Sequence, residues 1–149
     1  EMLPEALLKL KEGWLTPQPQ DSAAATYTRL IEKEDGELDW RLSAEELARR
    51  VRAFDPWPGC FTRWEGRILK VLQAIAFPPK DGAAPGTVVP LEGAPTPVGV
   101  VTGQGVLGLA RVQLEGRKAM SAGEFLRGAR GFVGAVLPLP ERKEAERSP

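Results

Sequence analysis

The chain has 149 residues, the size of one medium domain or of a small domain with a linker. Hydrophobic residues make up 42% of it, which is enough to build a core. It contains no histidine and a single cysteine, which excludes an internal disulfide, Cys–His catalysis and a zinc site formed by this chain alone. The single cysteine favours a reducing compartment, and we expect a cytoplasmic protein.

The formal net charge is zero, but the charge is distributed unevenly along the chain. Residues 1–48 carry 5 basic and 11 acidic side chains, residues 49–134 carry 12 basic and 6 acidic, and residues 135–149 carry 3 of each. The basic middle part favours an anionic partner, although ordinary surface charge explains the distribution equally well. Arginine (13) outnumbers lysine (7) and asparagine is absent, which favours a thermophilic or high-GC source.

The first part of the chain contains one helix and a long irregular segment. Pro4 suits a first turn and Gly13 suits a C-terminal cap, which predicts a helix over residues 4–12 with leucines along one side. Residues 15–26 are rich in Pro, Gln and Ala and lack apolar periodicity. They predict an extended linker.

The clearest helix is predicted over residues 43–54. Ser43 and Glu46 form a capping box, in which the serine hydroxyl accepts from the third helical N–H and Glu46 reaches back. The motif RAFDPWPGC, residues 52–60, ends this helix because its first proline disfavours helical geometry at the residue before it. We expect the motif to be a rigid joint rather than a reaction site, with Trp57 plugging one end of the domain that follows.

The rest of the chain predicts short strands separated by glycine and proline turns, followed by a helix. The candidate strands span residues 60–65, 67–77, 86–91, 97–102 and 105–114. A second capping box, Ser121 with Glu124, opens a short helix predicted over residues 122–130. Five short strands with such turns predict a small closed or nearly closed antiparallel barrel, so the expected fold class is mainly β with short helices.

Four motifs in register resemble one known family. They are QDSAAATY (20–27), KEDGELDW (33–40), RAFDPWPG (52–59) and GRKAMSAGEFLRG (116–128). Each motif is weak alone, but together they resemble the C-terminal part of the methionyl-tRNA formyltransferase family over about residues 3–134. The resemblance implies an OB-like Greek-key β-barrel, similar to an oligonucleotide-binding fold, in residues 42–137. It also implies an interdomain linker in residues 15–41, the last helix of a missing N-terminal catalytic domain in residues 1–14, and a tail in residues 138–149.

The resemblance further implies an activity. The family transfers a formyl group from 10-formyltetrahydrofolate to the amino group of methionyl initiator tRNA, with an Asn-His-Asp catalytic set in the N-terminal domain. Because this chain has no histidine and no asparagine, we expect it to be non-catalytic and to bind neither cofactor nor metal. Its expected partners are initiator methionyl-tRNA, held by backbone contacts, and the N-terminal domain. We expect a monomer with no membrane contact.

Six basic residues are candidates for contacting tRNA phosphates: Arg29, Lys33, Arg117, Lys118, Arg127 and Arg130. The first two lie at the linker exit, where the family carries basic residues, although its usual lysine is replaced here by Leu30. The next two lie on a tight turn at the barrel rim, and the last two lie around the final helix. For each of them, a solvated surface charge is the alternative.

Other basic and aromatic residues are expected to have structural roles. Four basic residues alternate with apolar ones and are predicted at outward strand positions: Arg63, Arg67, Lys70 and Arg111. Four rings have the chemistry to stack on bases, but core packing is the favoured interpretation: Trp57, Phe61, Trp64 and Phe77. Trp40 is expected to pack the linker exit onto the barrel, and Cys60 to be a small buried residue.

Two alternative functions remain open. Amino-sugar formyltransferases and 10-formyltetrahydrofolate dehydrogenase carry a related C-terminal barrel without a tRNA substrate. The stretch KAMSAGEFLRG, residues 118–128, and the long linker favour the tRNA enzyme. The second alternative is a protein-interaction barrel that binds no nucleic acid, which the zero net charge supports.

Overall fold

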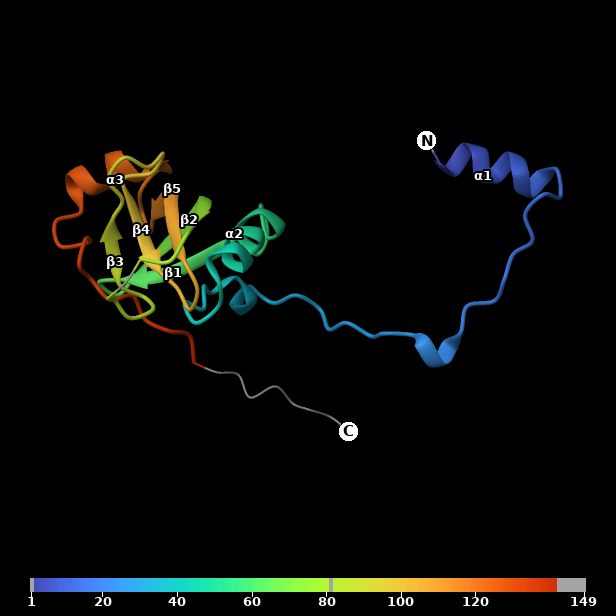
Figure 1. Ribbon diagram of the computed structural model, residues 1–149, viewed down its shortest axis with the longest axis horizontal. Helices are drawn as coiled ribbons and strands as arrows, with labels where there is room; N and C mark the ends of the chain where they lie inside the picture. Colours follow the sequence, from blue (N-terminus) through green and yellow to red (C-terminus); the bar gives the residue numbers. More distant parts are fainter. Residues whose placement is uncertain (1, 81, 142–149) are drawn as a thin grey trace. The chain divides into compact units, whose positions relative to one another are not determined.

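The structure is a computed structural model that describes residues 2–80 and 82–141 (Figure 1). The chain divides into two units, residues 1–30 and residues 31–149. In the described part of the chain, all strands and all buried residues belong to the second unit. The predicted mainly β fold, a small antiparallel barrel-like sheet with short helices, is confirmed.

The first unit contains α1 (Met2–Lys11) and the short 3-10 helix η1 (Ser22–Ala24), joined by irregular chain. Every described residue of this unit is exposed, including the leucines of α1. Asp21 caps η1 by accepting a hydrogen bond from the backbone N–H of Ala23 at 2.9 Å. The predicted helix is present, and the segment predicted as extended, residues 15–26, is irregular except for η1.

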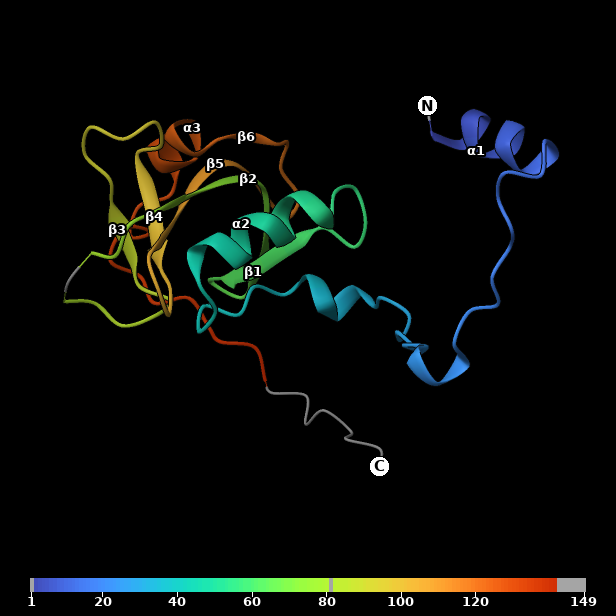
Figure 2. The same ribbon diagram turned by 45° about the vertical axis from the view of Figure 1, so that its right-hand side comes forward.

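The second unit is built on a curled antiparallel sheet (Figures 1 and 2). Its strands are β1 (Cys60–Trp64), β2 (Arg67–Phe77), β3 (Val88–Pro90), β4 (Val98–Val101), β5 (Val106–Leu114) and β6 (Met120–Ser121). The order is β1-β2-β5-β4-β3, with β6 also paired to β5. The first five match the predicted strands closely, whereas β6 was not predicted because two residues carry no periodic pattern.

Three short helices lie against this sheet: η2 (Lys33–Gly36), α2 (Ala44–Ala53) and α3 (Ala122–Gly128). Figures 1 and 2 show α2 and α3 on different sides of the curl. The Ser43 hydroxyl caps α2 by accepting from the N–H of Glu46 at 3.2 Å, as predicted. The Glu46 carboxylate accepts instead from Arg50 at 3.0 Å, so only half of the predicted capping box forms.

The core follows from alternation along the strands. Leu69 and Val71 on β2, and Val112 and Leu114 on β5, point inward and are buried. Trp40, at 0% exposure, closes the core where the chain enters the barrel, as expected. Apolar side chains spaced two apart on neighbouring strands thus build one shared core.

Both edges of the sheet are covered by short segments. At the β1 edge, Glu37 forms a parallel bridge with Phe61, and at the β3 edge, Val136 forms an antiparallel bridge with Thr87. Such cover protects the unpaired edges from pairing with another chain. The Glu37 bridge also ties the segment after η2 to β1, which fixes how residues 31–41 enter the barrel.

The RAFDPWPGC motif forms a joint between α2 and β1, but one expectation about it is wrong. Trp57 does not plug the barrel, because 62% of its surface is exposed. Both of its neighbouring proline bonds, Asp55–Pro56 and Trp57–Pro58, are cis. The loop is closed by the N–H of Gly59, which donates to the Phe54 carbonyl at 2.9 Å. The barrel core excludes Trp57 because the loop projects beyond the end of α2, where exposed residues surround it.

Candidate nucleic-acid interface

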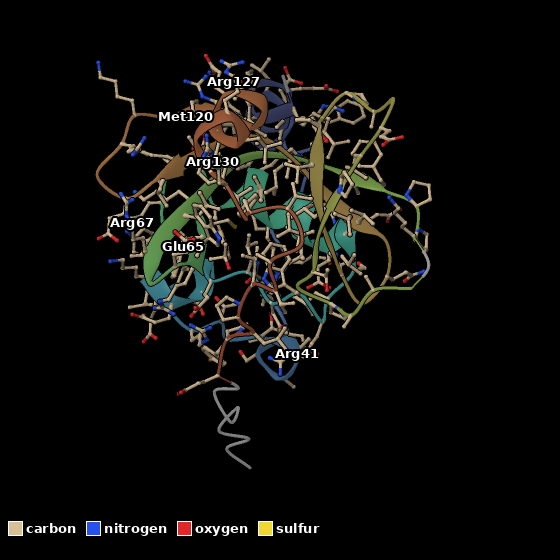
Figure 3. The ribbon with its side chains drawn as sticks, turned by 90° about the vertical axis from the view of Figure 1, so that its left-hand side faces the viewer. Arg41, Glu65, Arg67, Met120, Arg127 and Arg130 are labelled. Atoms are coloured by element: carbon tan, nitrogen blue, oxygen red, sulfur yellow. The ribbon has the colours of Figure 1, made fainter. Side chains whose placement is uncertain are left out.

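Two of the six predicted contacts, Arg127 and Arg130, are positioned by α3. The Ser121 hydroxyl accepts from the N–H of Glu124 at 3.2 Å, and Glu124 accepts from the Ser121 N–H at 2.9 Å, which completes the predicted capping box. Phe125 is buried beneath the helix, so Arg127 remains on its exposed side, and Arg130, just beyond the helix, is also exposed. Figure 3 shows Arg127 on α3 and Arg130 just after it, well apart from Arg41.

The carboxylate of Glu124 lies among these cations. The pKa of Glu124 is lowered, first by the hydrogen bond from the Ser121 N–H, then by the Ser121 side chain, and further by the charges of Arg127 and Arg111. Glu124 is therefore held in its charged form at neutral pH. It partly offsets the positive potential at the start of α3, while Arg130 lies beyond the helix.

Two more predicted contacts, Arg117 and Lys118, lie on the turn between β5 and β6, and both are exposed. The turn uses Gly116 at a φ of 75°, and the N–H of Arg117 donates to the Leu114 carbonyl at 2.9 Å. Gln113 donates from its side chain to the Arg117 carbonyl at 3.0 Å. These contacts hold the backbone of the turn and leave both cationic side chains exposed.

A neighbouring hairpin supports this turn. Arg67, predicted at an outward strand position, is exposed at the start of β2, opposite Trp64. Its guanidinium donates to the carbonyl of Glu115 in the β5–β6 turn. Arg67 therefore links the β1–β2 turn to the turn that carries the predicted contacts, which sequence alternation alone did not indicate.

The last two predicted contacts, Arg29 and Lys33, fall in different units. Arg29 belongs to the first unit and donates to the Leu30 carbonyl at 3.1 Å, whereas Lys33 begins η2 in the second unit and is exposed. The other four all lie on the segment that runs from β5 through β6 to just beyond α3. The candidate interface is therefore centred on that segment.

Other aromatic residues mostly have structural roles, as expected. Trp64, Phe125 and Phe132 form a cluster of edge-to-face contacts with ring centroids 5.0 to 5.5 Å apart. Phe61 is 7% exposed beside η2, and Phe77 is half-buried against Gly108. These rings are buried or half-buried, whereas Trp57 is exposed.

The single cysteine is buried, and the described residues form no cluster of metal-ligating side chains. Burial raises the pKa of the Cys60 thiol to about 11, so it stays protonated and unreactive at neutral pH. No cluster of three metal-ligating side chains is found in residues 2–80 and 82–141. In the same ranges, no helix has the length and apolar character needed to cross a membrane. What this part of the chain presents is a cationic surface on a stable sheet.

Comparison with known proteins defines the class first. Residues 30–130 match the model of the formyl transferase C-terminal domain, which covers more than half of the chain. The chain therefore belongs to the formyl transferase family and carries its C-terminal domain. Among curated relatives, it is 38% identical to the methionyl-tRNA formyltransferase of Chloroflexus aurantiacus over 128 residues, covering 86% of this chain and 41% of the relative. It is 45% identical to that of Anaeromyxobacter dehalogenans over 139 residues, covering 87% of this chain and 42% of the relative.

The chain thus spans less than half the length of these relatives. Among solved structures, it resembles HypX from Aquifex aeolicus in complex with tetrahydrofolic acid, with a TM-score of 0.56 at 22% identity, covering 89% of this chain and 23% of HypX. A further HypX variant, A392F-I419F, gives a TM-score of 0.54 at 25% identity, covering 85% of this chain and 23% of that one. These likenesses support the shared fold.

Proposed function

We propose that this chain is the tRNA-binding part of a methionyl-tRNA formyltransferase. The observation that carries the proposal is the set of four exposed cations from the β5–β6 turn to just beyond α3, in a domain whose curated relatives bear that name. Phosphate contacts by Lys and Arg supply most sequence-independent affinity for nucleic acid. The barrel positions initiator methionyl-tRNA through its backbone and leaves the chemistry to another part of the protein.

In this proposal, the catalytic residues lie outside these 149 residues. The chain has no histidine and no asparagine, so it lacks two members of the Asn-His-Asp set that the family resemblance implies. The whole protein would use 10-formyltetrahydrofolate as formyl donor, while this part binds no cofactor. Its exposed α1 would pack against the catalytic domain. We propose a cytoplasmic, monomeric protein, in keeping with a role in translation initiation.

Filter binding of labelled initiator tRNA to this chain over a salt series tests the RNA-binding role. We expect retention at low salt that falls as salt rises, with a slope of log K against log salt of roughly −0.7 to −0.9 for each phosphate contact. Negligible retention at low salt, or retention that does not change with salt, would refute the role. If the chain retained no tRNA, a barrel that binds another protein would be the better explanation of its function.

A formyl-transfer assay tests the placement of the chemistry. With methionyl-tRNA and 10-formyltetrahydrofolate as substrates, we expect no product above background from this chain alone. Reproducible turnover by the purified chain would show that it contains a complete catalytic site, which the proposal denies.

A further inference from the structure

A second group of cations, distinct from the six predicted contacts, lies on the outer face of the sheet. It consists of Arg63 on β1, Lys70 on β2 and Arg111 on β5, all exposed, and is called here the outer-sheet row. The opposite face of the same strands carries buried Leu69 and Val112. The sequence predicted these outward positions but gave them no partner.

The strand register brings the row together. Lys70 lies directly opposite Phe61 on β1 and opposite Gln113 on β5. Arg63 is two residues along from Phe61, so it is a diagonal neighbour of Lys70 at about 7–8 Å. Arg111 is two residues along from Gln113, beyond a β-bulge between Val71 and Gln73 of β2 that pairs it with Gln73. The three long side chains therefore stand near enough to contact successive groups of one extended anionic ligand.

The three cations differ in how far they are neutralised. Arg63 pairs with Glu37 at 2.5 Å, so its charge is partly offset. Arg111 lies near Glu124, which it shares with Arg127. Lys70 makes no hydrogen bond or ion pair within residues 2–80 and 82–141. Lys70 and Arg111 are therefore the members of the row most available to an outside anion.

A hollow connects the row to the predicted interface. It has a volume of about 230 Å³ and is lined by Ile68, Lys70, Gln113, Glu115 and Gly116. Gln113, in its lining, also donates to the Arg117 carbonyl at 3.0 Å. The hollow thus lies beside the turn that carries Arg117 and Lys118, so a ligand on that turn would extend towards Lys70.

We propose that Lys70 and Arg111 bind backbone phosphates of RNA, which extends the interface from the β5–β6 turn across the outer sheet face. This inference rests on the proposed function. An acidic protein is the less favoured occupant, because protein interfaces need a desolvated apolar or aromatic centre. Here Phe61 is 7% exposed and the half-buried Ile68 is the only apolar side chain lining the hollow. The exposed side chains of Lys70 and Arg111 can instead contact phosphates of an RNA helix.

The test compares two double variants of this chain in tRNA filter binding over a salt series. Lys70→Gln with Arg111→Gln removes two charges from the row. Arg52→Gln with Lys80→Gln removes the same charges from exposed positions elsewhere. We expect the first pair to flatten the slope of log K against log salt by about 1.4 to 1.8, since each lost phosphate contact removes about 0.7 to 0.9. The second pair should keep the wild-type slope.

A charge-conserving pair, Lys70→Arg with Arg111→Lys, should retain the wild-type slope if charge at these positions is what matters. Equal slope changes in both neutralised pairs would overturn the inference while leaving tRNA binding intact. If only the Lys70→Gln/Arg111→Gln variant lost binding of a labelled polyglutamate peptide, and its tRNA binding were unchanged, the inference would be overturned in favour of an acidic protein as the ligand. A wild-type chain that retains no tRNA would refute the proposed function itself, so the two failures are distinguishable.

Discussion

The two units of this chain differ in whether their apolar side chains are buried. In the second unit, Trp40 and Phe132 are completely buried, and the sheet supplies a shared core. In the first unit, Leu7 is 56% exposed and Trp14 is 80% exposed, although both are strongly apolar. The second unit therefore has a hydrophobic core that stabilises it, whereas the first has no core within its described residues.

This difference explains what each unit contributes. A ten-residue helix such as α1 is marginal in water without tertiary packing, so we expect it to fray when nothing covers it. The barrel, in contrast, holds its cationic residues on a framework of paired strands and capped helices. Phosphate binding by a pre-formed surface avoids the entropic cost of ordering that surface. Substitutions in the two units should therefore differ in their effect on stability.

Two tryptophan substitutions compare the units directly. Trp40→Ala removes a fully buried ring and should lower the free energy of unfolding by about 3–5 kcal/mol. Trp14→Ala removes a ring that is 80% exposed and should leave the free energy of unfolding of the barrel unchanged. Urea unfolding followed by circular dichroism measures both.

Trp40→Phe adds a finer control. The Trp40 Nε1 has no hydrogen-bond partner in the described part of the chain, so phenylalanine loses ring volume without losing a polar contact. We expect it to cost less than the alanine variant. If Trp14→Ala destabilised the chain as much as Trp40→Ala, the contrast between the two units would be wrong.

Two glycine substitutions test how firmly η2 is attached to the barrel. A Cβ on Gly36 would lie 2.0 Å from the Gly59 carbonyl oxygen, which forces the two backbones apart. We expect Gly36→Ala to cost about 1–3 kcal/mol, as overpacked sites do. Gly128→Ala is the control, since its Cβ would meet nothing within 4 Å. Thermal melting of both variants measures the difference, and equal melting temperatures would show that η2 is not locked to the joint.

The smallest expected effect concerns the pH dependence of stability. Because the folded-state pKa of Glu124 is lowered, its ionised form stabilises the fold above the unfolded-state pKa. That stabilisation is lost as the pH falls through the lowered folded-state pKa. We expect Glu124→Gln to destabilise the barrel at pH 7 and the difference from wild type to shrink in acid. Glu5→Gln, in α1, should leave barrel unfolding unchanged at every pH. A constant difference for Glu124→Gln would contradict this account.

Much of this architecture could be predicted from the sequence. The bounds of β2 were predicted correctly, residues 67–77, because glycine and proline pairs end its apolar pattern on both sides. The Ser121 capping box was also predicted, since serine and glutamate three residues apart are a local signal. Local chemistry determines both features.

Features set by tertiary contacts could not be predicted in the same way. The exposure of Trp57 depends on where the joint lies relative to the barrel, and composition favours burial of any tryptophan. The proximity of Lys70 to Arg111 depends on the pairing of β2 with β5, which lie far apart in the sequence. Arg67 is exposed as predicted, but its hydrogen bond to the β5–β6 turn depends on the same strand pairing. For the candidate site, the sequence indicated which cations to consider, and the register shows which of them are neighbours.

The most direct test of the account is a map of where RNA binds. Amide resonances of the isotope-labelled chain would be followed while initiator tRNA is added at low salt. The account predicts the largest changes at residues 111–130 and at Lys70, with residues 2–15 of the first unit unaffected. Largest changes in residues 2–15 or around Trp57, or no change at residues 111–130, would contradict the claim that the barrel is an RNA-docking surface.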